Sequence, residues 1–345
     1  MNSILENKAF LFLICLLLGI LTSFSLPPYN LFFINFLTLP LLLYILVNYV
    51  NKKTISFFVG WIFGFGYFIS NLYWITNSLT FDVNFKFFIP FALILIPLFL
   101  GIFYGLVTFL CNFFNLKNKI SSILIFSIFF GGIEFLRSFI FGGFPWNLVV
   151  FSLSNNLHSL QILSYIGTYS LNLLSITIFL LPVIFFFKYK SLTKFLIFGL
   201  SLILVMINFL YGNLIIKNFE KKKYDNLSSI IRVVSPNVPI ERFLSNQDTE
   251  KSINELISLS DPQNLKKTIF IYPEGIITGI YLKDLKFFKD IFKDNYNTNH
   301  KVILGINSIN QNKIYNSLIV LNSESELLYK YNKNKLVPFG EFLPF

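Results

Sequence analysis

The sequence predicts a multipass α-helical membrane domain followed by a partial α/β domain. Of its 345 residues, 54% are hydrophobic, 19% are aromatic and only 13% are charged, and the mean hydropathy is +0.65. Soluble domains carry about twice that share of charged residues, so the composition indicates a membrane protein. The charged residues are also unevenly placed, with 13 in residues 1–216 and 32 in residues 217–345. We therefore predict a transmembrane domain over 1–216 and a polar domain over 217–345.

The net charge of +11 does not indicate nucleic-acid binding. The lysines lie between apolar segments or among acidic residues, and no basic stripe interleaved with aromatic residues occurs. Both cysteines, Cys15 and Cys111, fall inside apolar runs, where a thiol behaves as a small hydrophobic group. Neither indicates a disulfide, a metal site or a nucleophile, and we expect no metal and no cofactor.

Seven segments are apolar over a length that suits a membrane span, which needs about 20 residues of helix. The first follows Lys8 and has the apolar core of a signal peptide, but Pro27-Pro28 follows it in place of a small-residue cleavage site. We therefore keep it as a helix. The expected spans are 9–26, 31–50, 55–76, 87–114, 120–141, 160–187 and 195–216.

Lysines between the spans predict the orientation. They follow the second, fourth and sixth spans, whereas the alternate connections carry only Asp82 and Lys86 as charged residues. Because positively charged loops remain in the cytoplasm, we expect a cytoplasmic N-terminus. An odd number of spans then places the residues after 216 on the outer side of the membrane.

An acid and a base occur together inside the fifth predicted span. Glu134 and Arg137 are three residues apart, which puts them on one face of a helix. Charged groups within a membrane are costly and usually functional. The alternative is a structural pair that only fixes helix packing.

Two uncharged aromatic segments follow apolar spans. Tyr73 and Trp74 end the third span, and the run GGFPWNLVVFS at 142–152 contains Phe144, Trp146 and Asn147. Aromatic side chains favour the membrane interface. We expect these five residues to form a lipid-binding surface at the outer interface, and a plain aromatic belt is the alternative.

The pattern of the chain changes at residue 230. Short β-branched runs now alternate with polar stretches of helical periodicity, at 248–260 and 282–293, and this alternation predicts a layered α/β or α+β domain. The expected strands are 230–235, 268–272, 301–306, 316–321 and 326–331.

Two residues of this domain are candidates for chemistry. Glu274 leaves the end of an apolar strand in the run YPEG, as a general base would. Lys333 lies in YNKNKLVPFGEF, between Lys330 and Lys335. From spacing alone, a lone glutamate in a turn is more often a surface acid, and Lys333 is less specific still.

Several runs together resemble the apolipoprotein N-acyltransferase family, which joins a helical membrane domain to a nitrilase-like domain. The YxKxxLVPFGEF run is the most specific, and EFLR followed by GFPWN is nearly as specific. The resemblance implies an αββα sandwich for residues 217–345, and it implies a bacterial inner membrane with these residues on the periplasmic side. The matching runs, in order, are GYFISNLYWITNSL, EFLRSFIFGGFPWNL, RVVSPNVP, YPEG, YNS and YNKNKLVPFGEFLPF.

The resemblance also implies a reaction. In it, a cysteine thiolate takes an acyl chain from a phospholipid and passes it to the amine of the diacylglyceryl-cysteine that begins an apolipoprotein. Glu274 matches the family's glutamate base, Lys333 matches the lysine that stabilises the oxyanion, and Glu341 matches a further acid of the site. Asn316 and Phe243 fall at or near positions that contact substrate.

The family's nucleophile lies downstream of the LVPFGEF run, so we expect it to lie beyond Phe345 and this chain to be C-terminally truncated and inactive alone. Cys15 and Cys111 do not replace it, because both are predicted inside the bilayer. Tyr272 stands where the family usually has tryptophan, which keeps an aromatic ring at that position.

Three other functions remain open from the residues. One is a membrane-tethered amide or nitrile hydrolase, which would not need seven helices with aromatic loops. The second is a multipass transporter with an outer cap, although the chain shows no internal repeat. The third is a fragment that only binds lipid or lipoprotein.

Overall fold

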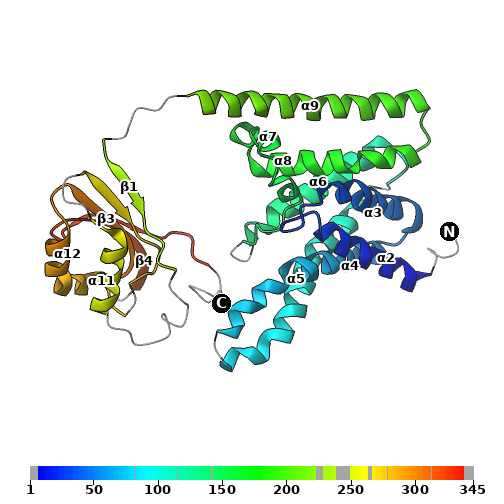
Figure 1. The fold of residues 1–345 in the computed structure, drawn as a ribbon. Coiled ribbons are helices and arrows are strands. Elements are labelled where there is room, and N and C mark those ends of the chain that lie inside the picture. Colours follow the sequence, from blue (N-terminus) through cyan, green and yellow to red (C-terminus); the bar gives the residue numbers. More distant parts are fainter. Residues whose placement is uncertain are drawn as a thin grey trace. The chain divides into compact units, whose positions relative to one another are not determined.

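The chain divides into two compact units in the computed structural model shown in Figure 1. The helical unit is Met1–Lys222 and the α/β unit is Lys223–Leu343. The structure describes residues 7–81, 83–114, 116–140, 143–222, 228–237, 249–262, 266–277, 279–311 and 313–337.

The helical unit consists of apolar α-helices joined by short 3-10 helices (Figure 1). Its α-helices are α2 (Lys8–Ser23), α3 (Asn35–Tyr49), α4 (Lys53–Leu72), α5 (Ile89–Asn112), α6 (Ile120–Arg137), α7 (Leu157–Leu160), α8 (Leu163–Leu180) and α9 (Ser191–Lys221). Its 3-10 helices are η1 (Phe32–Ile34), η2 (Tyr73–Thr80), η3 (Val83–Phe88), η5 (Val149–Leu153) and η6 (Leu181–Phe186).

Six helical segments of the described chain are long and apolar enough to cross a membrane. They coincide with the second to seventh predicted spans, and the chain is therefore a membrane protein. The first predicted span corresponds to α2, which has only 16 residues. At 1.5 Å per residue it is about 24 Å long, shorter than the bilayer core of about 30 Å. The six segments are Phe32–Tyr49, Lys53–Thr80, Val83–Asn112, Ile120–Arg137, Leu163–Phe186 and Ser191–Lys221.

Small residues let α2, α4 and α5 pack closely. A Cβ atom at Gly19 of α2 would lie 2.0 Å from the Phe63 carbonyl oxygen of α4. Between α4 and α5, the Ser56 and Thr108 hydroxyls each donate a 2.6 Å hydrogen bond to the other residue's carbonyl. Helices in membranes associate through such close backbone approach and interhelical hydrogen bonds.

The sixth predicted span, 160–187, is not one continuous helix. Gly167 has φ +74 and interrupts α8, and η6 replaces α-helix after Leu180. A residue with this positive φ does not continue an α-helix, so the predicted span, which Leu163–Phe186 matches in length and apolar character, contains a kink.

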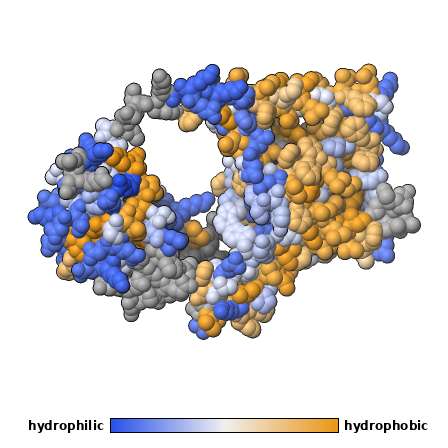
Figure 2. Space-filling model, viewed as in Figure 1, coloured by the Kyte–Doolittle hydropathy of each residue, from blue (hydrophilic) through white to orange (hydrophobic). Residues whose placement is uncertain are grey.

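The last helix of the unit, α9, is hardly buried. Only 6% of its most apolar stretch is covered by the rest of the protein, so its side chains suit contact with lipid. It meets α7 at Gly212, where a Cβ atom would lie 1.8 Å from the His158 carbonyl oxygen. Hydrophobic residues cover most of the helical unit's surface seen in Figure 2.

The α/β unit contains one mixed sheet with strand order β1-β2-β3-β4-β5. The first three strands are parallel, and β3, β4 and β5 pair antiparallel. All five predicted strands are present, and so are both predicted helical stretches. The strands are β1 (Ile230–Val233), β2 (Thr268–Ile271), β3 (His300–Asn310), β4 (Lys313–Asn322) and β5 (Leu327–Asn332), and the helices are α11 (Thr249–Ser260), η7 (Leu282–Phe288) and α12 (Lys289–Asn295).

The sheet has one covered face and one open face among the described residues. Helices α11 and α12 bury the first face, where Phe270, Val302 and Leu304 form a core with Ile257 and Phe292. Alternation along each strand sends the neighbouring side chains to the other face. That open face is apolar and exposed, and its exposed members include Ile231, Val233, Leu318, Tyr329 and Tyr331.

Candidate functional site

Glu274 and Lys333 lie in direct contact in the α/β unit. Glu274 leaves the end of β2, and Lys333 directly follows β5. The Lys333 Nζ atom donates a hydrogen bond of 3.1 Å to Glu274 Oε1. The fold thus brings together two residues that are 59 positions apart in the sequence, while their catalytic roles remain a prediction.

Asn316 of β4 holds both members of this pair. Its side-chain amide donates a hydrogen bond of 2.5 Å to Glu274 Oε1. Its backbone carbonyl accepts a hydrogen bond of 2.8 Å from the Lys333 backbone N–H. The antiparallel pairing of β4 with β5 therefore positions the backbone of Lys333. The Asn316 side chain positions the Glu274 carboxylate opposite the Lys333 ammonium group.

Gly305 of β3 lets the Glu274 segment pass close over the open face of the sheet. A Cβ atom at Gly305 would lie 2.9 Å from both Glu274 Cα and the Gly275 nitrogen. Atoms of a side chain do not approach backbone so closely, so only glycine fits this position without displacing Glu274. Neither the role of Gly305 nor the close approach of β3 to residues 274–275 was predicted from the sequence.

Substituting Gly305 by alanine should displace the Glu274 carboxylate from Lys333. We expect Gly305→Ala to lower the rate of any reaction that the Glu274–Lys333 pair catalyses by about 10²-fold, because a displacement of about 1 Å can cost that much. Gly199→Ala is the matched control, since a Cβ atom there meets no described atom within 4 Å. Equal rates in the two variants would show that the position of Glu274 does not matter.

The pair is accessible rather than buried. The Glu274 side chain is 62% exposed and the Lys333 side chain 32% exposed within the described chain. Exposed ion pairs contribute about 0 to 1 kcal/mol to stability, so stability alone does not account for three converging polar groups. A carboxylate can take up and return a proton, and an ammonium group beside it can stabilise developing negative charge.

Three other residues noted in the sequence lie elsewhere. Tyr272 is buried on the helix-covered side of the sheet, where its hydroxyl bonds with those of Ser260 and Tyr296. Burial raises the pKa of the Tyr272 hydroxyl, so this hydrogen-bonded group stays neutral. Its ring therefore does not line the Glu274 site. Glu341 and Phe243 lie outside the described residues.

The predicted aromatic residues of the helical unit gather around a cavity of about 500 Å³. The rings of Trp74 and Trp146 stack with centroids 5.2 Å apart, and the Phe144 ring lies 5.4 Å from that of Trp146. Tyr73 and Asn147 also line this cavity. The turn after α2 and the end of α4 supply further lining residues that were not predicted from the sequence, and these include Pro27, Pro28, Tyr29, Ser70 and Asn71.

Glu134 and Arg137 lie in contact inside the same unit, as their spacing predicts. The Arg137 Nη2 atom is 3.8 Å from Glu134 Oε1, and both side chains are almost fully buried. The backbone N–H of Phe144 donates to the Arg137 carbonyl, so the turn after α6 folds back onto this residue.

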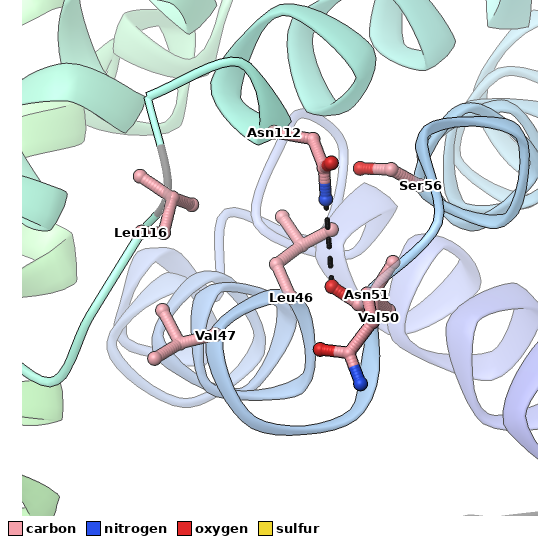
Figure 3. A pocket seen from close by; sticks show the side chains of 7 residues that line it. All are labelled: Leu46, Val47, Val50, Asn51, Ser56, Asn112 and Leu116. Atoms are coloured by element: carbon pink, nitrogen blue, oxygen red, sulfur yellow. Dashed lines mark hydrogen bonds between the residues drawn. The ribbon is translucent and has the colours of Figure 1, made fainter.

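A second, smaller cavity of about 190 Å³ lies where α3, α4 and α5 meet, as Figure 3 shows. Its polar residues are Asn51, Ser56 and Asn112, and the Asn112 amide donates a hydrogen bond of 3.4 Å to the Val50 carbonyl (Figure 3). None of the residues predicted to bind substrate lines it.

Comparisons with known proteins agree on one family. Residues 18–181 match the family described as the apolipoprotein N-acyltransferase N-terminal domain. Proteins named apolipoprotein N-acyltransferase are similar over nearly the whole chain. That of Rickettsia prowazekii is 31% identical and that of Rhizobium rhizogenes 26% identical, each over 96% of this chain and 66% of the relative. That of Brucella melitensis is 25% identical over 95% of the chain and 64% of the relative. The chain thus spans just under two-thirds of the length of these relatives.

Proposed function

Because the chain belongs to the apolipoprotein N-acyltransferase family, we propose that its gene product transfers an acyl chain from a phospholipid to an apolipoprotein. The acceptor is the α-amino group of the N-terminal diacylglyceryl-cysteine. The observation that carries this proposal is the contact between Glu274 and Lys333, with Asn316 holding both. The pair has the two groups that thioester chemistry requires, a proton acceptor and a cation.

In the first half-reaction, Glu274 takes the proton from a cysteine thiol, and the thiolate attacks the carbonyl carbon of the phospholipid ester. Lys333 stabilises the resulting oxyanion. The C–O bond then breaks, the lysophospholipid oxygen takes the proton back from Glu274, and the acyl chain remains on sulfur as a thioester. Splitting the transfer in this way replaces one difficult step with two easier ones.

In the second half-reaction, the apolipoprotein amine attacks the thioester carbon. Glu274 accepts the amine proton and returns it to the departing thiolate, while Lys333 again stabilises the oxyanion. The products are the N-acylated lipoprotein and the free thiol, so the step needs no oxidant, reductant or cofactor. Glu341, by its place in the PFGEF run, supports Lys333 in this scheme.

The thiol is supplied by a cysteine other than Cys15 and Cys111. Both are buried in the helical unit, on α2 and α5, and neither belongs to the α/β unit that holds Glu274 and Lys333. We propose that the nucleophile lies beyond residue 345 in the gene product, so that residues 1–345 alone form no acyl adduct.

The phospholipid binds at the aromatic cavity of the helical unit. Its volume of about 500 Å³ is within the usual range of about 300 to 1,000 Å³ for ligand sites. Trp74, Trp146 and Tyr73 offer apolar surface, and Asn71 and Asn147 offer polar groups. This combination suits the glycerol and upper acyl region of a lipid, with Phe144 packed behind Trp146. Asn316 and Phe243 are proposed to contact substrate in the polar domain.

The proposed topology places these parts in a bacterial inner membrane. The N-terminus is cytoplasmic, seven helices span residues 1–216 with α2 as the short first one, and residues 217–345 are periplasmic. The lysines between spans support this orientation. The open apolar face of the sheet supports an αββα sandwich in which a second sheet covers Ile231, Val233 and Leu318.

A transfer assay tests the proposed function. The full-length gene product would be placed in vesicles with acyl-labelled phospholipid and a diacylglyceryl-cysteine peptide. We expect the label to appear on the α-amino group of the peptide. Release of free labelled fatty acid without peptide labelling, or hydrolysis of simple amides instead, would refute acyl transfer and favour a hydrolase.

A further inference from the structure

The segment 143–148 has no helix or strand of its own, yet buried side chains hold its backbone in place. Arg137 Nη1 donates to the carbonyl oxygens of Phe144, at 3.0 Å, and Trp146, at 2.9 Å. The Tyr67 hydroxyl donates to the Asn147 carbonyl at 2.9 Å. Three carbonyl groups of this segment thus accept hydrogen bonds from buried side chains. Inside a membrane protein such bonds replace those that water would otherwise supply.

The end of the segment is held as well. The Val150 backbone N–H donates a hydrogen bond of 2.8 Å to the Asn172 Oδ1 atom of α8. Gly143, with φ +85, makes the turn into the segment, and a Cβ atom there would lie 2.3 Å from the Ser138 carbonyl oxygen. The backbone from Gly143 to Val150 is therefore constrained at both ends and in the middle.

Glu134 lies at the centre of the groups that hold this segment. Its carboxylate accepts a 2.8 Å hydrogen bond from the Tyr104 hydroxyl and another from the Asn172 amide, and it lies 3.8 Å from Arg137. Glu134, Arg137, Asn172 and Tyr104 are each at most 1% exposed. We call these four residues and Tyr67 the polar cluster. Its members come from α4, α5, α6 and α8.

Bundle stability alone does not explain such a cluster. Desolvation of buried ionic groups offsets much of their attraction, and well-packed apolar side chains of similar volume often stabilise a fold equally well. Retained intramembrane charges therefore point to a specific geometric task. Here the side chains of Arg137, Tyr67 and Asn172 all form hydrogen bonds with the backbone between Phe144 and Val150.

That segment carries the ring that completes the aromatic cavity. Trp146 is 48% exposed and stacks on Trp74 of η2 at an interplanar angle of 23°. Both tryptophans line the 500 Å³ cavity, as does Asn147, whose φ of +58 places it in the left-handed region. A backbone held less firmly would let Trp146 leave Trp74 and change the shape of the cavity.

We infer that Glu134 and Arg137 are positioning residues for substrate binding: through the polar cluster they hold segment 143–148 so that Trp146 stacks on Trp74 and the lipid cavity keeps its shape. The positioning role follows from the hydrogen bonds above. That the cavity receives the acyl donor rests on the proposed function.

The Trp74–Trp146 stack gives a direct optical measurement. Stacked indoles about 5 Å apart produce an exciton couplet in circular dichroism, and the chain has only three tryptophans. In a Trp61→Phe parent reconstituted in nanodiscs, Trp74→Phe should abolish the couplet and so assign it. Arg137→Met and Tyr67→Phe should each reduce it by at least about half, and Arg137→Lys should reduce it less than Arg137→Met, because a cation remains near the carbonyls.

Ser127→Ala is the matched control. Ser127 is buried on the same helix as Glu134 and Arg137, and among the described residues its hydroxyl donates a hydrogen bond to the Ile123 carbonyl one turn earlier. We expect it to leave the couplet unchanged. A full couplet in both Arg137→Met and Tyr67→Phe would overturn the inference. Should Arg137→Met fail to fold, Tyr67→Phe decides, because it removes a single oxygen atom.

Kinetics separate this inference from the proposed function. Tyr67→Phe should raise the KM for phospholipid several-fold, by about the effect of one lost hydrogen bond, and change kcat little, because binding rather than chemistry is affected. An altered kcat with unchanged KM would contradict a positioning role in lipid binding. The unaltered protein and all variants could fail to transfer acyl chains while the couplet changes as expected. In that case the proposed function is refuted and the inference that the polar cluster positions Trp146 is supported.

Discussion

Replacing Glu274 by glutamine should lower acyl transfer by about 10³-fold, within the range of about 10² to 10⁴ for loss of a general base. Glutamine keeps the shape of the side chain and one oxygen for the Asn316 amide, so the fold should be unaffected. It cannot accept a proton, however, and both half-reactions stop at the first proton transfer. Peptide N-acylation by the full-length gene product measures the loss.

Glu324→Gln is the control for this variant. Glu324 also lies on the surface of the α/β unit and pairs with Lys289 at 3.8 Å. It is 51% exposed, close to the 62% of Glu274. We expect Glu324→Gln to transfer acyl chains at the normal rate. If both variants lost activity equally, the effect would come from surface charge and the role of Glu274 as base would be refuted.

Replacing Lys333 by methionine should lower acyl transfer by about 10² to 10³-fold, as expected for removal of one oxyanion donor. Methionine preserves the length of the side chain but carries neither charge nor donor. The loss should appear in kcat, because the oxyanion exists only in the transition state and the intermediate. Lys333→Arg should recover part of the rate, since it restores the charge with a different geometry.

Lys330→Met and Lys289→Met test whether position rather than charge matters. Lys330 is only three residues from Lys333 and belongs to β5, while Lys289 forms another exposed ion pair, with Glu324. Both should retain the normal rate. A loss of activity in Lys330→Met as large as that in Lys333→Met would contradict the specific role given to Lys333.

The strands of the α/β unit were predictable because their residues alternate or run as short β-branched stretches between polar turns. The predicted ranges 268–272 and 301–306 differ from β2 and β3 only at their ends, where β3 continues to Asn310. Their pairing was not predictable from local pattern, since it depends on contacts between distant residues. Glu274 and Lys333 were identified by family resemblance, whereas Gly305 was missed because a glycine in a strand does not reveal which segment crosses it.

In the helical unit, other features could not be predicted from the sequence. Its charged pair was found because Glu134 and Arg137 stand out in an apolar segment. Tyr67, Tyr104 and Asn172, which complete the polar cluster, were missed because uncharged polar residues are common in membrane helices. The break at Gly167 and the shortness of α2 were also missed, since hydropathy reports apolar length and not where a helix begins and ends.

Mass spectrometry of the intact full-length gene product after incubation with phospholipid tests the central claim most directly. The account predicts that the unaltered protein gains the mass of one acyl chain, bound as a thioester that hydroxylamine removes, and that Glu274→Gln does not gain it. An acyl adduct of equal yield on Glu274→Gln, or no adduct on the unaltered protein, would contradict the claim that Glu274 and Lys333 activate a thiol for acyl transfer.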